Sequence, residues 1–269
     1  MHITIYRPSG ISERGHRMNN EDSVYPLPER VSASQRLFMV CDGVGGNEKG
    51  EVASALACES IHIYFDTFLK PGEEPDAEFI RKAVQYTEAC FDTYIKEHPE
   101  AKGMATTLTL AYITSFGIIM AHIGDSRIYY MREGEILHQT EDHSLVNSLV
   151  KLGRITPEEA RTHPSRNVIM RAIQGTNEPA EPDVAVWNDV QAGDYLFLCT
   201  DGVLEAMNSK RISEIFRCNY NLETIKGLIM EACQMRSRDN YSFYIVRIRK
   251  VQDHVNLKQN LLLFLHSFI

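Results

Sequence analysis

One stretch decides the fold of this chain: Leu37-Phe38-Met39-Val40-Cys41-Asp42-Gly43-Val44-Gly45-Gly46. Its first five residues are apolar, which is the pattern of a strand buried on both faces. The strand delivers the carboxylate of Asp42 into a turn rich in glycine, where a ligand can approach the backbone closely. A carboxylate in that place is costly unless a cation or hydrogen bonds hold it. The stretch alone is equally compatible with an ordinary β-turn.

Two later stretches favour the cation. Residues 195–200 form a second apolar strand that ends in Asp201-Gly202, and Asp239-Asn240 stands just before a strand-like run at residues 242–248. These strand ends could bring three carboxylates to one edge of a sheet. Carboxylates clustered without cysteine or histidine suit a hard cation such as magnesium or manganese.

Composition describes an ordinary globular protein. The chain has 269 residues, of which 43% are hydrophobic and 24% charged, and its net charge of −8 argues against nucleic acid as a partner. Six cysteines without a C-x-x-C pair indicate buried thiols in a reducing compartment. The N-terminus alternates like a strand, and no run is long enough to cross a bilayer. We therefore expect a cytoplasmic protein without a firm membrane signal.

The pattern along the chain predicts an α+β fold. Helical spacing of apolar residues covers 49–68 and 77–97, and strand-like runs follow at 105–113, 116–123 and 128–131. Short links between these runs indicate an antiparallel meander, and strands that follow one another without helices exclude a doubly wound parallel sheet. Residues 142–175 interrupt the strands as a candidate flap near the site.

The second half of the chain resumes the sheet and then adds helices. We expect strands at 183–187 and 195–200, helices at 209–216 and 222–235, and a last strand that ends near Arg249. Residues 1–250 thus form a single domain, followed by an apolar C-terminal tail at 251–269. The tail either closes the protein's own core as a short helix or docks to a partner subunit or a membrane surface.

Several other chemistries are not supported. Gly124-Asp125-Ser126 lacks the second glycine of a serine-hydrolase elbow, and there is no P-loop and no H-E-x-x-H. Asp142-His143-Ser144 has the residue types of a catalytic triad side by side, where they cannot form its geometry. The scattered histidines are more typical of surface or core residues than of ligands. Five polar motifs remain, in this order: Arg17 with Glu21-Asp22; Asp42-Gly43 with Gly45-Gly46; Gly124-Asp125-Ser126-Arg127; Asp201-Gly202; Asp239-Asn240.

In this order the motifs resemble the metal-dependent protein phosphatases of type 2C. The resemblance runs from Gly15 to Ile248. It implies a four-layer sandwich, αββα, in which helices flank two antiparallel sheets and a two-metal centre lies at one edge. It also implies hydrolysis of phosphoserine and phosphothreonine in phosphorylated protein substrates.

The resemblance assigns the metal ligands. Asp42 would bridge two divalent ions, Mn²⁺ or Mg²⁺, with the carbonyl oxygen of Gly43 on one of them. Asp201 and Asp239 would complete the other ion. Asp125 would hold, together with Asp201, a third and weaker ion. Two such ions lower the pKa of a bridging water, so that hydroxide can attack phosphorus near neutral pH without a covalent intermediate.

It also assigns the residues around the ions. Glu21 and Asp22 would hold waters bound to the ions, and Arg17 would clamp the substrate phosphate. Thr106-Thr107 matches the small hydroxyl pair that opens a strand after the second long helix.

One position departs from many relatives in eukaryotes. Val44 stands where they have a histidine proposed as the general acid, which leaves that acid unassigned. Two alternatives to a protein phosphatase stay open: a hydrolase of small phosphoesters, and a non-catalytic regulatory module on the same fold.

Overall fold

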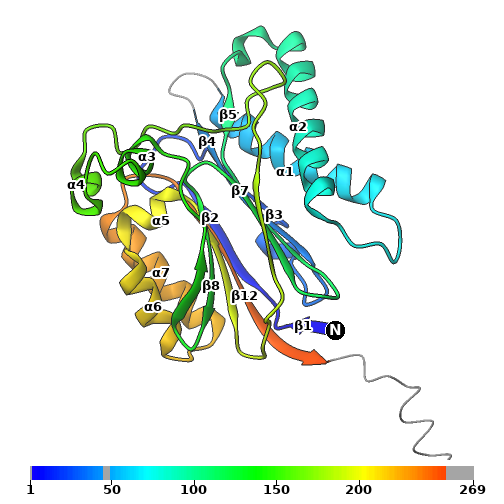
Figure 1. The fold of residues 1–269 in the computed structure, drawn as a ribbon, viewed down its shortest axis with the longest axis vertical. Helices are drawn as coiled ribbons and strands as arrows, with labels where there is room; N and C mark the ends of the chain where they lie inside the picture. Colours follow the sequence, from blue (N-terminus) through cyan, green and yellow to red (C-terminus); the bar gives the residue numbers. More distant parts are fainter. Residues whose placement is uncertain (1, 45–48, 253–269) are drawn as a thin grey trace, which may run out of the picture.

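A 12-residue strand, β12 (Tyr241–Gln252), organises the first of two sheets. In the computed structural model, which describes residues 2–44 and 49–252, both sheets are six-stranded and antiparallel. They face each other as the two inner layers, with helices on the outer faces (Figure 1). The predicted α+β sandwich, αββα, is confirmed.

The first sheet follows the order β1, β12, β11, β8, β9, and β2 pairs with β12 beside β1. Its members come from both ends of the chain, so the fold closes only when distant segments meet. The bounds are β1 (His2–Ile5), β2 (Ser9–Glu13), β8 (Arg127–Arg132), β9 (Glu135–Gln139) and β11 (Tyr195–Cys199).

The second sheet follows the order β10, β7, β6, β4, β3, with β5 paired to β4. The bounds are β3 (Asp22–Tyr25), β4 (Leu37–Val44), β5 (Ala105–Thr106), β6 (Leu108–Ile113), β7 (Ile118–Ile123) and β10 (Asp183–Trp187).

Helices cover the outer faces. α1 (Gly50–Phe68) and α2 (Ala77–Glu97) pack on the second sheet. α5 (Asp201–Ala206), α6 (Ser209–Arg217) and α7 (Leu222–Arg236) pack on the first. α3 (Leu145–Lys151) and α4 (Pro157–Thr162) lie in the connection between β9 and β10. Short 3-10 turns occupy Pro28–Arg30 and Pro99–Ala101. Among the described residues, no helix has both the length and the apolarity that crossing a membrane requires.

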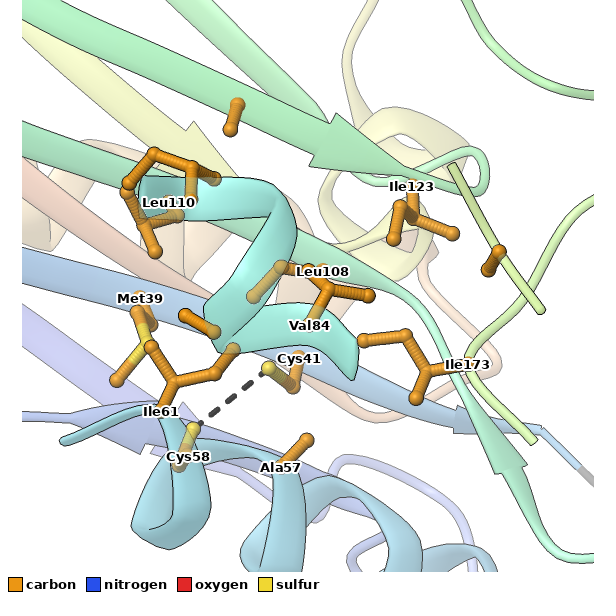
Figure 2. Close-up of a cluster of buried hydrophobic side chains, with 14 of the residues drawn as sticks. Met39, Cys41, Ala57, Cys58, Ile61, Val84, Leu108, Leu110, Ile123 and Ile173 are labelled. Atoms are coloured by element: carbon orange, nitrogen blue, oxygen red, sulfur yellow. Dashed lines mark hydrogen bonds between the residues drawn. The ribbon is translucent and has the colours of Figure 1, made fainter. Parts of the chain in front are cut away.

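The apolar run of β4 is explained by burial on both of its faces. Met39 and Cys41 point toward α1 and α2, whereas Phe38 and Val40 pack between the two sheets. Figure 2 shows the outer cluster, in which the Sγ atoms of Cys41 and Cys58 lie 3.6 Å apart. Because side chains alternate along a strand, burial on both faces requires a continuous apolar run.

Four expectations were wrong in detail. β7 and β8 do not continue one meander, because they belong to different sheets. β2 and β3 were not among the predicted strands, and helix α5, which begins at Asp201, was not among the predicted helices. β12 continues beyond Arg249 to Gln252. The tail from residue 253 onward lies outside the described residues.

Candidate metal centre

The predicted carboxylates lie where the two sheets meet at one edge. Asp22 and Asp42 belong to β3 and β4 of the second sheet, where they are register partners. Asp201 begins α5 directly after β11, and Asp239 precedes β12, both on the first sheet. Asp125 lies in the short link where the chain crosses from β7 to β8. Elements from both sheets thus bring these five acids together.

Burial and mutual repulsion disfavour the charged form of these carboxyl groups. Burial, followed by the charges of Asp22, Asp201 and Asp125, raises the pKa of Asp42 well above its usual value. Burial is likewise the main cause that raises the pKa of Asp22 to about 8, of Asp125 to about 7 and of Asp201 to about 6. Neighbouring carboxylates add to each shift. The negative electrostatic field that disfavours ionisation of these carboxyl groups also stabilises a cation bound among them.

The side chains fit a hard divalent cation. Asp22 accepts a hydrogen bond from the Thr200 hydroxyl at 3.0 Å through Oδ2, but its buried Oδ1 has no donor among the described residues. The buried Oδ1 of Asp125 likewise has no donor among the described residues. Buried polar atoms in proteins are normally satisfied, so two orphaned carboxylate oxygens at one edge point to a ligand. Oxygen donors of this kind are those that Mn²⁺ and Mg²⁺ prefer.

Close backbone contact explains the glycine at position 43. A Cβ atom there would lie 2.1 Å from the carbonyl oxygen of Gly50 and 2.7 Å from that of Glu21. The Gly43 amide donates to the Glu21 carbonyl at 3.0 Å. Any larger residue would therefore separate the end of β4 from the start of α1 and from Glu21.

Asn240 frames the site in a way that the sequence motif did not reveal. Its Oδ1 accepts from the Glu21 amide at 2.9 Å, and its Nδ2 donates to the carbonyls of Arg14 and Asn19 at 2.7 and 2.8 Å. One amide side chain thus ties the loop that carries Arg17 to the start of β12.

Arg17 makes a contact that the sequence did not predict. Its Nη2 donates to Oδ2 of Asp239 at 2.7 Å, and 58% of its side chain is exposed. The guanidinium therefore lies at the rim of the acidic cluster, opposite one of the predicted ligands. Its predicted role as a phosphate clamp stays a prediction.

A second group of ligand types was missed. The ligand atoms of His122, His143 and Asp183 all lie within 4.8 Å of one another. His122 and Asp183 are register partners on β7 and β10, a pairing that residues so far apart in sequence do not disclose. However, the guanidinium of Arg171 already fills this group, 2.7 Å from Asp183 and 3.1 Å from His143. We therefore assign it no metal.

The pKa shifts predict how the metal-free protein responds to pH. Because the raised pKa values let folded Asp22, Asp125 and Asp201 keep protons that the unfolded chain has released, the contribution of these three groups to stability is greatest at low pH and is lost as pH rises. In chelator, the melting temperature should fall between about pH 5 and about pH 8. Excess Mn²⁺ should remove the fall, since the ion replaces the protons. Calorimetric scans would check this, and a flat profile in chelator would contradict it.

Comparisons with known proteins agree with this geometry. The family model for protein phosphatase 2C matches residues 9–228. The serine/threonine protein phosphatase PstP of Mycobacterium tuberculosis is 35% identical over 248 residues, covering 91% of this chain and 45% of PstP. The chain thus spans about half the length of that relative. The serine/threonine phosphatase stp of Listeria monocytogenes is 31% identical over 239 residues, covering 87% of this chain and 93% of that protein.

Solved structures give the same result. The crystal structure of M. tuberculosis PstP matches with a TM-score of 0.80 at 33% identity, over 91% of this chain and 100% of that one. The PstP catalytic domain in complex with two manganese ions matches with a TM-score of 0.78 at 32% identity, over 93% and 100% of the two chains. On the family model, the identity to these relatives and the shared fold, this chain belongs to the protein phosphatase 2C family.

Proposed function

We propose that this protein is a metal-dependent serine/threonine protein phosphatase that acts on phosphorylated protein substrates. The observation that carries the proposal is the convergence of Asp22, Asp42, Asp125, Asp201 and Asp239 at the seam of the two sheets, with two buried carboxylate oxygens lacking donors among the described residues. PstP, a family member named as a serine/threonine phosphatase and solved with two manganese ions, supports the same activity and cofactor here.

Each acid has a proposed place around the ions. Asp42, the carbonyl of Gly43, Asp201 and Asp239 would hold two Mn²⁺ or Mg²⁺ ions. Asp125 would contribute to a third, weaker one. When bound, the ions would supply a water nucleophile at neutral pH and would neutralise charge on the phosphoryl group.

The protein's own groups orient this centre. Glu21 and Asp22 line it from the second sheet and would accept hydrogen bonds from water. Val44, at the end of β4, has no ionisable side chain. The leaving group therefore has no imidazole proton donor at that position. Arg17, at the rim, would bind the phosphate of a bound substrate through its guanidinium.

Replacing Arg17 by alanine should raise KM for a phosphopeptide about tenfold while turnover changes little, because a charge-assisted hydrogen bond to the phosphate is lost. Steady-state kinetics would measure this. Arg14→Ala, in the same loop, is the matched control and should resemble the wild type. If Arg17 served only to neutralise Asp239, the variant would change the Mn²⁺ requirement and leave KM unaltered.

One experiment separates the proposal from its alternatives. Rates on phosphoserine peptides and on small aryl phosphates are compared with Mn²⁺ and with chelator. A protein phosphatase prefers the peptides and needs the metal; a small-phosphoester hydrolase reverses the preference; a regulatory module hydrolyses neither. We also infer a cytoplasmic location, supported by six cysteines that are all free.

A further inference from the structure

The connecting segment, residues 140–174, follows β9 and carries α3 and α4. Its His143 contacts Gly124, the neighbour of the predicted ligand Asp125. This connecting segment is fixed at its far end by paired backbone hydrogen bonds between Thr106 and Ile173, of 3.0 and 2.9 Å. Its near end reaches the link between β7 and β8, where His143 contacts Gly124. That link contains Asp125.

His143 holds Gly124 with two hydrogen bonds. The His143 amide donates to the Gly124 carbonyl at 2.8 Å, and the Gly124 amide donates to Nδ1 of the His143 ring at 3.1 Å. On its other side, Gly124 lies against Thr107: its φ is +99°, and an added Cβ would meet Thr107 Cγ2 at 2.6 Å. Gly124, the residue before Asp125, is therefore held between Thr107, at the junction of β5 and β6, and the connecting segment.

The ring of His143 is itself held in one orientation. A backbone amide can only donate, so Nδ1 must be the acceptor and Nε2 must carry the proton. Nε2 lies 3.2 Å from Oδ2 of Asp183, which can accept its proton, and 3.1 Å from Nη1 of Arg171, which cannot. Arg171 fixes that carboxylate through Oδ1 at 2.7 Å and donates to the Glu181 carbonyl at 2.9 Å. His122 stacks on the ring at 4.4 Å.

Further hydrogen bonds connect the Gly124–Ser126 link to Asp42, the ligand predicted to be shared by the two ions. The Asp42 amide donates to the Thr107 hydroxyl at 3.0 Å, and the Thr107 and Ser126 hydroxyls lie 2.8 Å apart. Both residues are fully buried. One chain of contacts thus runs from Asp183 through His143 and the Gly124–Ser126 link to the end of β4.

We propose that His143 is a positioning residue that fixes the Gly124–Asp125 link through Nδ1 and so sets the geometry of the Asp125 carboxylate at the metal centre. This rests on the proposed function for its effect on catalysis. The clamp itself is a property of the metal-free protein and can be tested without activity.

Two substitutions separate the two ring nitrogens. In His143→Asn, the amide Oδ1 occupies nearly the place of Nδ1 and can still accept from Gly124. In His143→Gln, the amide lies nearer the place of Nε2 and can reach Asp183, but leaves Gly124 without an acceptor. Amide hydrogen exchange at Gly124, measured by NMR in chelator with the amides of β11 as reference, reports on the clamp. Exchange at Gly124 should be about fivefold faster in the glutamine variant and near the wild-type rate in the asparagine variant.

The same variants are then titrated with Mn²⁺ by calorimetry and in the phosphopeptide assay. The weakest binding step should weaken in His143→Gln and be retained in His143→Asn, with KM for the peptide unchanged in both. Asp183→Ala should speed exchange at Gly124 in the wild-type background but add nothing to His143→Asn, which no longer uses that anchor.

Equal behaviour of the two variants, whether both normal or both impaired, would overturn the proposal, because the ring would then only fill space or not matter. Inactive wild-type protein would refute the proposed function instead, and the exchange comparison would still decide the role of His143.

Discussion

The substitution Asp42→Asn is expected to lower turnover on a phosphopeptide by about a thousandfold or more. The substitution keeps the shape of the side chain but removes the charge predicted to bridge two ions, and metal-ion stabilisation of a phosphoryl transition state is worth several kcal/mol. Steady-state rates at saturating Mn²⁺ measure the loss.

A second readout makes this prediction specific to metal binding. Since burial and neighbouring acids disfavour the Asp42 carboxylate, the variant in chelator should unfold at a higher temperature than the wild type near pH 8, while Mn²⁺ should stabilise it less. Activity would thus fall as metal-free stability rises. A variant destabilised in chelator and still responsive to Mn²⁺ would show that Asp42 acts through packing.

The substitution Asp239→Asn should lower turnover by about a hundredfold and remove one Mn²⁺ binding step. The effect is smaller than at Asp42 because only one of the two predicted ions loses a charged ligand. The fold should persist, since an amide Oδ1 can still accept from the Asn240 backbone at the 2.8 Å contact seen for Asp239. Calorimetric titration with Mn²⁺ would count the binding steps.

The matched control for Asp239 is Asp66→Asn, a substitution on the exposed face of α1. It should bind Mn²⁺ and turn over like the wild type. If Asp239→Asn retained wild-type stoichiometry and affinity, its assignment as a ligand would fail, and its contact with Arg17 would become its main function.

Sequence alone predicted the elements that carry a strong local pattern. The five apolar residues of β4 reflect burial on both faces of a strand, and the helical spacing of α2, which ends at Glu97 as expected, reflects burial of one face of a helix.

The features that the sequence did not predict depend mostly on contacts between residues far apart in the chain. A short link after β7 has the same local pattern whether the next strand stays in the sheet or crosses to the other one, so the place of Asp125 at the crossing could not be read from the sequence. Asp-Gly after β11 suits a turn and a helix start equally. The pairing of His143 with Asp183, 40 positions away by number, depends on the register of β10 against β7, which only the folded sheet fixes.

The position of β12 has a consequence for how the protein is made. β1 and β2 are synthesised before the rest of the described chain, yet their partner is the last described strand, with Ile3 opposite Val251 and Ile11 opposite Phe243. The first sheet therefore cannot close until nearly the whole described chain has been synthesised, and such long-range pairing folds slowly. Asp239 emerges just before that strand. A chain interrupted earlier would carry Asp22, Asp42 and Asp125 but would lack Asp239, and so would have no complete set of the predicted ligands.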